Sequence, residues 1–301
     1  MNYDLRIMYY NIYGYIKYFD KENHPNLYTG PIALRQENEM TLIRRYEPDI
    51  LGMQEYCSAF HQDMTPLLEE AGYAQIDVWH EEPGRKGNRI NFTPLFYRKD
   101  RVIPLDFGFL LYDGPNDVNS KSMTWAVFET LKDKKRFIAV CTHFMYNDPK
   151  LPEGGPNAAR ISNAKQLLEM LEEISRRKAG IYAGLPVIIG GDLNCKHGSD
   201  PFQLLYDSNL KWLYEEAEVT NESCGMKGYA VYDELQGSYI TCPVPGDDPY
   251  GSIDHMWLRQ GAAHQEQVKV LEYATVKDKE ACLSSDHCPR YANILIDRGK
   301  A

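Results

Sequence analysis

Polar side chains that suit metal or phosphate chemistry recur in this sequence where apolar runs end. They are Asn11, Gln54-Glu55, Thr142-His143, Asp192 with Asn194, Asp254-His255, and Ser285-Asp286-His287. One polar strand end is common, because strands exit into water. Six ends that offer Asn, Glu, Asp and His are harder to attribute to chance, since strand ends and loops on one rim are where sites assemble.

The stretch from Ile188 to Asn194 shows this pattern most clearly. The apolar run Pro186 to Ile189 predicts a buried strand that ends at two glycines. A carboxylate, Asp192, and a carboxamide, Asn194, follow two positions apart. If extended geometry continues past the glycines, both side chains project from the same face. Asn and Asp are also frequent in turns, so this pair taken alone is more typical of a turn than of a site.

The whole set fits the attack of water on a phosphate ester. A hard cation such as Mg²⁺ prefers carboxylate oxygens, retains waters and polarises phosphoryl oxygens. Glu55 is the expected anchoring carboxylate, and Asp192 and Asp286 could share metal or water duties. Asn11 and Asn194 would orient water or phosphate without adding negative charge.

Two imidazoles and a further carboxylate complete the predicted chemistry. His143 and His287 would donate hydrogen bonds to phosphoryl oxygens as negative charge builds in the transition state. A carboxylate such as Asp254 would hold an imidazole in one tautomer and raise its pKa. No residue resembles an activated nucleophile, so we expect direct attack by water and no covalent phospho-enzyme.

Simpler explanations compete at several positions. His143 alone fits a partly buried histidine, Glu55 a solvated charge, and Asp286-His287 a turn or helix cap. His255 fits a structural or supporting role. The remaining histidines match no motif: His24, His61, His80, His197 and His264. The group Cys195, His197, Cys282, His287 and Cys288 matches no zinc spacing.

Two further segments have open interpretations. Most aromatic residues near the first strand favour a structural role, with one or two able to stack on substrate; they are Tyr9, Tyr10, Tyr13, Tyr15, Tyr18 and Phe19. The loop that carries Arg85, Lys86 and Arg89 offers either solvated charge or cations that face a phosphate.

Composition narrows the class of protein. The chain has 301 residues, 43% of them hydrophobic and 25% charged, as is ordinary for a globular protein. A net charge of −10 argues against a broad basic surface for long duplex nucleic acid. The seven cysteines form no CxxC pair and fit buried free thiols. No secretory signal or membrane span is evident, so we expect a cytoplasmic protein.

The elements that must position these residues can be read from periodicity and turn signals. Predicted strands are Leu5 to Ile12, Asp49 to Glu55, Leu95 to Tyr97, Thr124 to Thr130, Phe137 to Phe144, Pro186 to Ile189, Tyr239 to Cys242, Ile253 to Leu258, Val268 to Val276 and Tyr291 to Ile296. Predicted helices are Ile32 to Tyr46, about Met64 to Ala71, Asn157 to Lys178 with Asn157 as N-cap, and one that opens at Asp200-Pro201. No linker or repeat divides the chain, so we expect a single domain over residues 1–301, with two sheets covered by helices.

Taken in order, the motifs resemble those of the endonuclease/exonuclease/phosphatase superfamily, the deoxyribonuclease-I-like phosphoesterases. The resemblance spans nearly the whole chain and rests on the six motifs above, including Gly191-Asp192-Leu193-Asn194 and Ser285-Asp286-His287. It implies a four-layer α/β sandwich, in which two mixed, mainly antiparallel sheets pack face to face with helices outside.

The resemblance also implies roles and a cofactor. Glu55 would be the main Mg²⁺ ligand, with Mn²⁺ as an alternative metal and with Asn11 and Asp286 close by. Asp192 would position or activate water, and Asn194 would orient Asp192 or phosphate. His143 and His287 would act on phosphate, and Asp254 would pair with His287. Arg160 also fits the bacterial hydrolases as a candidate for substrate binding. Independently of the resemblance, Arg89 in the charged, glycine-bearing loop is a further candidate for substrate binding.

Two departures from the superfamily pattern affect the expected substrate. Lys121-Ser122 stands where an arginine is often found, and the loop Tyr146 to Pro156 has no basic cluster. Both weaken a DNA-cleaving assignment. The substrate classes left open are nucleic acid, nucleotide, inositol phosphate and lipid headgroup, with small or single-stranded molecules favoured. Alternative functions are a non-catalytic binding scaffold and a lipid phosphodiesterase. We expect a monomer without stable membrane association.

Overall fold

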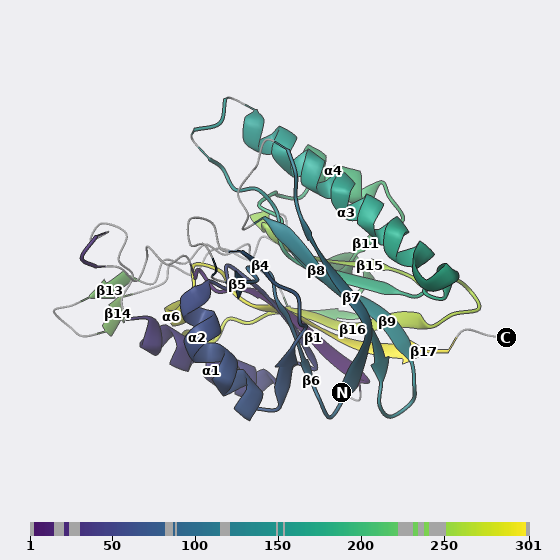
Figure 1. The fold of residues 1–301 in the computed structure, drawn as a ribbon, viewed down its shortest axis with the longest axis horizontal. Helices are drawn as coiled ribbons and strands as arrows, with labels where there is room; N and C mark the ends of the chain where they lie inside the picture. Colours follow the sequence, from purple (N-terminus) through teal and green to yellow (C-terminus); the bar gives the residue numbers. More distant parts are fainter. Residues whose placement is uncertain are drawn as a thin grey trace.

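Two β-sheets pack face to face and carry helices on their outer sides, as the computed structural model shows (Figure 1). The structure describes residues 3–14, 21–23, 31–81, 87, 89–114, 121–148, 150–152, 154–221, 231–233, 238–240 and 251–298. Apolar side chains fill three layers: one between the sheets and one beneath the helices on each side. The predicted four-layer α/β sandwich is confirmed.

The first sheet has seven strands and contains both chain ends of the fold. Its order is β12 (Val219–Thr220), β16 (Gln267–Thr275), β17 (Arg290–Asp297), β1 (Leu5–Asn11), β2 (Ile50–Gln54), β6 (Leu95–Arg98) and β3 (Tyr73–Gln75). β1 runs parallel to β2 and antiparallel to β17. The carboxyl end of β2 and the start of β17 therefore lie beside the carboxyl end of β1.

The second sheet has six strands. Its order is β11 (Lys211–Trp212), β15 (Asp254–Arg259), β10 (Val187–Asp192), β9 (Arg136–His143), β8 (Ser122–Thr130) and β7 (Val102–Leu111). β9 and β10 are parallel, whereas β15 is antiparallel to β10. Two small sheets pair β4 (His80–Glu81) with β5 (Arg89–Ile90), and β13 (Val231–Asp233) with β14 (Ser238–Ile240).

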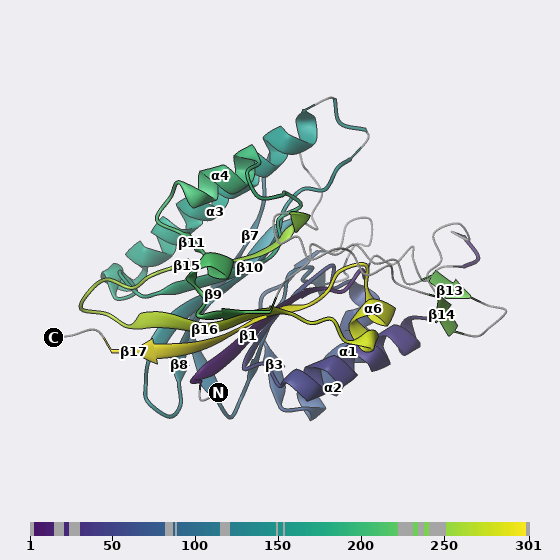
Figure 2. The same cartoon turned by 180° about the vertical axis from the view of Figure 1, so that it is seen from behind.

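Helices cover the outer face of each sheet, as the two opposite views show (Figures 1 and 2). The seven-stranded sheet carries α1 (Ile32–Tyr46), α2 (Ser58–Glu70) and α6 (Lys279–Ser284). The six-stranded sheet carries α3 (Gly155–Gly180) and α4 (Asp200–Tyr206), and the short α5 (Leu213–Glu216) follows β11. Among the described residues, no helix is long and apolar enough to span a bilayer.

Between the two sheets, the ring of Tyr9 packs against two glycines, Gly52 and Gly190. Tyr9 is buried, and its hydroxyl donates to the carbonyl oxygen of Ile188 at 3.3 Å. A Cβ atom placed on Gly190 would lie 2.1 Å from this ring, and one on Gly52 would lie 2.5 Å away. The first glycine after the apolar run of β10 is therefore required by packing. This agrees with the structural role favoured for Tyr9.

Helix prediction succeeded where an apolar stripe was long. The helix predicted from Ile32 to Tyr46 has those bounds. The helix α2 begins at Ser58, earlier than predicted, because Phe60 continues the buried stripe of Met64 and Leu68 by one more turn. The prediction of Asn157 as the N-cap of α3 is wrong.

The start and end of α3 differ from the prediction for identifiable reasons. Gly154 occupies the N-cap position, and Asn157 lies inside the first turn. The side chain of Asn157 instead donates to Asp200 Oδ2 at 2.9 Å and ties α3 to α4. Near the other end, Arg177 to Ala179 leave helical geometry, and Lys178 and Ala179 have positive φ.

The edge strand β7 was missed by the sequence analysis. It contains Pro104, which lacks the amide hydrogen that a central strand needs. An edge strand tolerates this loss, and the pairing with β8 shifts register between Pro104 and Asp106. The predicted strand Tyr239 to Cys242 is described only as Ser238–Ile240 within β14; residues 241 and 242 lie outside the described part.

The packing of the Tyr9 ring against Gly190 gives a stability prediction. Gly190→Ala should lower the free energy of unfolding by about 1–3 kcal/mol, because the added methyl group overpacks against the Tyr9 ring. Urea denaturation measures this change. As a control, adding Tyr9→Leu to Gly190→Ala should cost less than the sum of the two single changes. Strictly additive costs would contradict the proposed contact.

Candidate active site

Six chain segments bring polar side chains to one rim of the sandwich. β1 and β2 end there in one sheet, and β9 and β10 end there in the other. β15 and β17 run the opposite way and begin at the same rim. The two sheets are joined there by a hydrogen bond of 3.0 Å from Asn11 Nδ2 to Asp192 Oδ2. The site thus draws on both halves of the fold.

The buried carboxylate of Asp192 is the centre of this cluster. Besides Asn11, it faces Asn194, whose backbone amide donates to Oδ1 at 2.8 Å and whose side chain donates to Oδ2 at 3.2 Å. The Nε2 atom of His143 lies 3.3 Å from Asp192 Oδ2, and that of His287 lies 3.8 Å away.

These contacts keep Asp192 ionised. Burial by itself would raise the pKa of the Asp192 carboxyl, but the charge of His287 opposes it most strongly, followed by contacts with His143. Lys121 adds a further positive charge. The pKa of Asp192 is consequently well below its ordinary value, which favours the ionised form of this carboxylate.

Asn194 reaches Asp192 by a route that differs from the predicted one. The strand β10 continues past the two glycines as far as Asp192, but Asn194 adopts a left-handed conformation with φ of 50°, so the extended geometry ends before Asn194. The turn folds the amide and carboxamide of Asn194 back onto Asp192. Gly191 permits this path, because a Cβ there would lie 1.9 Å from the carbonyl oxygen of Thr142. The segment is both a turn and part of the cluster.

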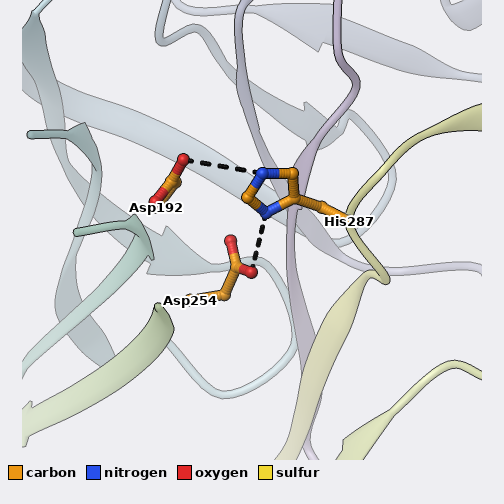
Figure 3. Close-up of side chains that lie close together, drawn as sticks. All are labelled: Asp192, Asp254 and His287. Atoms are coloured by element: carbon orange, nitrogen blue, oxygen red, sulfur yellow. Dashed lines mark hydrogen bonds and ion pairs between the residues drawn. The ribbon is translucent and has the colours of Figure 1, made fainter. Parts of the chain in front are cut away.

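The imidazole of His287 lies between two carboxylates, Asp254 and Asp192 (Figure 3). Its Nδ1 atom is 2.8 Å from Asp254 Oδ2. Burial would lower the pKa of His287, but Asp254 gives the largest opposing effect, with Asp286 and Asp192 adding to it. The pKa of His287 is therefore raised well above its ordinary value, which favours the imidazolium form.

Asp192, Asp254 and His287 have ligand atoms within 4.8 Å of one another and could in principle hold a metal ion. However, both ring nitrogens of His287 already face a carboxylate. A hydrogen-bonded imidazolium uses these nitrogens as donors, whereas a metal needs a free lone pair. The trio is thus better suited to placing charge and protons than to binding a metal.

Two other carboxylates have open oxygens. Glu55 follows β2 with φ of 62°, and its Oε2 atom is buried without a hydrogen-bond partner among the described residues. Asp286 Oδ1 has no such partner either and lies 3.6 Å from His287 Nε2. Burial raises the pKa of Asp286, and the negative charge of Asp192 adds to this effect. A hard divalent cation fits this donor set, because it accepts carboxylate oxygens and offsets their charge.

Two buried cations that the sequence analysis did not single out support the cluster. Lys121 Nζ is 2.7 Å from His143 Nε2, and Arg35 donates to the carbonyl oxygens of Ile12 and Ser284 at 2.5 and 2.6 Å. Arg35 thereby ties the chain next to Asn11 to the segment before Asp286. Lys121 was noted in the sequence only as the replacement for an arginine, and no sequence feature marked Arg35.

The 284–287 segment is also tied to β1 by a serine. Ser285 Oγ donates to the carbonyl oxygen of Asn11 at 2.6 Å and accepts from the backbone amide of His287 at 3.1 Å. One hydroxyl group therefore holds the backbone of two residues of the cluster. The serine of the Ser285-Asp286-His287 motif has a structural reason to be there.

Two predicted substrate-binding residues lie outside the contacts of Asp192. Arg160 is buried and donates to the carbonyl oxygen of Met145 at 3.2 Å and to Asn147 Oδ1 at 3.0 Å, so it supports the loop after β9. Arg89 is exposed on β5, 6.0 Å from the centre of the Trp79 ring. Arg85 and Lys86 lie outside the described residues.

His255 and His197 have structural contacts in place of a contact with Asp192. His255 Nε2 pairs with the carbonyl oxygen of Cys195 at 2.8 Å, and burial lowers the pKa of His255 to about 3, in keeping with a structural role. The ring of His197 packs against that of Trp212, with 5.3 Å between the ring centres. In the part of the chain that the structure describes, cysteines join no metal-binding group. His24, Tyr15, Tyr18, Phe19 and the side chain of Cys282 are outside that part.

The chain is similar in sequence to a known protein family and to a human phosphodiesterase. It matches the model of the Endonuclease/Exonuclease/phosphatase family over residues 8–287. Human 2',5'-phosphodiesterase 12 is 23% identical over 298 residues, which cover 90% of this chain and 47% of that protein. The chain thus spans about half the length of this curated relative.

Solved structures show the same fold. An endonuclease/exonuclease/phosphatase of Bacteroides vulgatus has a TM-score of 0.71 and 24% identity, covering 98% of this chain and all of the other. A mannosyl-6-phosphatase of Bacteroides thetaiotaomicron has a TM-score of 0.68 and 20% identity, covering 97% and 99%. Because the family match covers most of the chain, from within β1 to the Ser285-Asp286-His287 motif, the chain belongs to the Endonuclease/Exonuclease/phosphatase family, whose members are hydrolases of phosphate esters.

Proposed function

We propose that this protein hydrolyses a phosphate ester by direct attack of water and requires Mg²⁺, with Mn²⁺ as a substitute. The observation that supports this most strongly is the buried carboxylate of Asp192, contacted from both sheets by Asn11 and His143. A second supporting feature is the pair of carboxylates with open oxygens, Glu55 and Asp286, at the same rim.

The metal would be held by Glu55 and Asp286, with Asn11 close by. The Oδ1 atom of Asn11 accepts one hydrogen bond from the backbone of Tyr13 at 3.0 Å, which leaves a second lone pair for a ligand. When bound, the cation would polarise the phosphoryl oxygens and offset their charge. We propose Glu55 as the principal ligand because its Oε2 atom is buried and none of the described residues forms a hydrogen bond with it.

Asp192 would hold the attacking water. A carboxylate whose pKa is lowered is a weak base, so its larger contribution is to fix the water in line with the phosphorus atom. The carboxamides of Asn11 and Asn194 hold the carboxylate itself in one orientation. Both carboxamides donate to Oδ2, whereas the one hydrogen bond to Oδ1 among the described residues comes from the backbone amide of Asn194, so Oδ1 would have a lone pair for the water.

The imidazoles would act on the phosphate. His287, as the imidazolium form, would donate from Nε2 to a phosphoryl oxygen as charge builds there. Asp254 binds the other ring nitrogen and so fixes the orientation of the ring. Burial, followed by the charge of Lys121, lowers the pKa of His143, which would make it a neutral partner near the phosphate.

We propose a small or single-stranded substrate, because the net charge of −10 disfavours long duplexes. Relatives named 2',5'-phosphodiesterase and mannosyl-6-phosphatase indicate that diesters and monoesters both remain candidates. Arg89 is free to reach a distal part of the substrate, whereas Arg160 would support the rim from behind. A single domain, a monomeric state and a cytoplasmic location stay predictions.

Removing the metal or its ligand should abolish turnover. EDTA should stop hydrolysis of bis(p-nitrophenyl) phosphate or p-nitrophenyl phosphate, and Mg²⁺ or Mn²⁺ should restore it. Glu55→Gln and Asp192→Asn should each lower kcat by about 100-fold or more, because each removes a charge that acts at the reacting centre. Initial rates with both chromogenic esters measure the effect.

Exposed carboxylates provide the matched controls. Glu69→Gln and Asp63→Asn, both on the outer side of α2, should leave the rates unchanged. Full activity of Asp192→Asn would contradict the assigned role. Lack of turnover by the unaltered protein with a broad panel of nucleic acids, nucleotides, inositol phosphates and lipid headgroups would favour the non-catalytic scaffold instead.

Asp254 should act through His287. Asp254→Asn should lower kcat by about 10- to 100-fold with little change in KM, because the imidazole loses the partner that orients and charges it. The ¹⁵N chemical shifts of the His287 ring should show a lower pKa in this variant. An unchanged pKa of His287 would contradict the pairing, and His264→Asn at an exposed position serves as a control for assignment.

A further inference from the structure

Arg290 is a buried cation at the start of β17, shortly after His287 in the chain. Only 3% of the residue is exposed. Its Nη1 atom donates to Tyr273 Oη at 3.2 Å and to Thr275 Oγ1 at 3.0 Å, and its Nη2 atom donates to Ser252 Oγ at 2.6 Å. Burying a guanidinium group is costly unless hydrogen bonds compensate it, so these hydroxyl groups fix where the cation lies.

The hydrogen bond from Arg290 to Ser252 matters most, because the hydroxyl group of Ser252 also holds the backbone of Asp254. Ser252 Oγ donates to the carbonyl oxygen of Asp254 at 2.8 Å and accepts from the backbone amide of Asp254 at 3.1 Å. A hydroxyl group has one hydrogen and two lone pairs, and a guanidinium group can only donate. Arg290 therefore takes one lone pair of Ser252 and directs its single hydrogen towards Asp254. The turn that opens β15 is thereby held in one conformation.

Asp254 connects this turn to the rim. Its Oδ2 atom lies 2.8 Å from His287 Nδ1 (Figure 3). Arg290 and His287 belong to the same short segment, so the part of the chain that presents the imidazole also holds the carboxylate partner of that imidazole. Desolvation by itself would lower the pKa of the Arg290 guanidinium, but Tyr273 and Asp254 outweigh it, and the pKa is raised. The buried guanidinium group therefore stays charged and attracts Asp254.

We propose that Arg290 is a positioning residue for hydrolysis: through Ser252 it holds Asp254 in the orientation that keeps Oδ2 on His287 Nδ1. This inference rests on the proposed function and adds a residue that the sequence analysis did not single out. Without Arg290 the turn at Ser252 would be free to move, so the imidazole would lose the fixed partner that orients it. The effect falls on kcat and not on KM, because the ring acts on charge that builds in the transition state.

Steady-state kinetics with bis(p-nitrophenyl) phosphate and p-nitrophenyl phosphate test this order of action. Arg290→Met should lower kcat by about 10-fold while KM changes by less than about 2-fold. Arg290→Lys, which keeps the charge and can still donate a hydrogen bond, should recover part of the loss. In an Asp254→Asn background, Arg290→Met should lower kcat by less than about a further 2-fold, because the residue through which Arg290 acts is already changed.

Further variants separate this role from a contribution to folding. Thr275→Val removes a different hydrogen bond of Arg290 and leaves the bond to Ser252 in place, so it should lower Tm while kcat stays within about 2-fold. Ser252→Ala removes the link itself and should lower kcat as much as Arg290→Met does. Arg44→Met, at an exposed position of α1, is the matched control for the loss of an arginine and should leave Tm and kcat unchanged.

The hydrogen bond between His287 and Asp254 can be observed without turnover. Its Nδ1–H proton should give a downfield ¹H resonance, assigned by its loss in His287→Gln. In Arg290→Met and in Ser252→Ala this proton should exchange with solvent at least about 10-fold faster, because the carboxylate that accepts it is no longer fixed. In Thr275→Val its exchange should match that of the unaltered protein. Because this readout does not depend on catalysis, it remains informative even if no ester is hydrolysed and the proposed function fails.

These outcomes decide the proposal. Faster exchange of the His287 proton in Arg290→Met and Ser252→Ala, but not in Thr275→Val, supports it. Unchanged exchange in Arg290→Met would overturn it, and where that variant does not fold, unchanged exchange in Ser252→Ala would do so. Fully multiplicative losses of kcat when Arg290→Met and Asp254→Asn are combined would also overturn it, because Arg290 would then act independently of Asp254. A lower Tm with unchanged kcat and exchange would show a purely structural arginine.

Discussion

The hydrogen bond between Asn11 and Asp192 is the constraint on which the site depends, because it crosses from one sheet to the other. Asp192 is a buried anion that is stable only while donors from several strands surround it. Those donors come from β1, β9 and the segments beside β10 and β17. The carboxylate of Asp192 therefore has all its partners only when both sheets are in place. The fold and the chemistry are therefore specified by the same contacts.

Much of the fold and of the candidate site could be predicted from the sequence, because the end of a strand is marked by an apolar run followed by polar residues. Apolar runs that stop at Asn11, His143 and Asp192 mark both the strands and the polar rim, and the parallel and antiparallel order then places those ends together. The long helices were also visible, since their apolar stripes repeat over several turns. Patterns that depend on a single element are thus readable before the fold is known.

The rest depended on neighbours that are distant in sequence. Pro104 argues against a strand until β7 is known to be an edge, and the conformation of Asn194 is set by a turn that returns to Asp192. The burial of Lys121 follows from the contact between its side chain and His143, which no local pattern encodes. In each case the deciding interaction is tertiary, so a local rule had no access to it.

The packing of the Tyr9 ring against Gly52 and Gly190 has a consequence for how the protein would lose activity. Tyr9 and Asn11 lie on the same face of β1, two residues apart, so the packing of one ring governs the distance at which the carboxamide meets Asp192. A slight separation of the layers at this point would dismantle the catalytic arrangement while most backbone pairing within each sheet persisted. On heating, activity would then be lost before the protein unfolds. The packing between the two sheets would be the part of the structure whose loosening first abolishes activity.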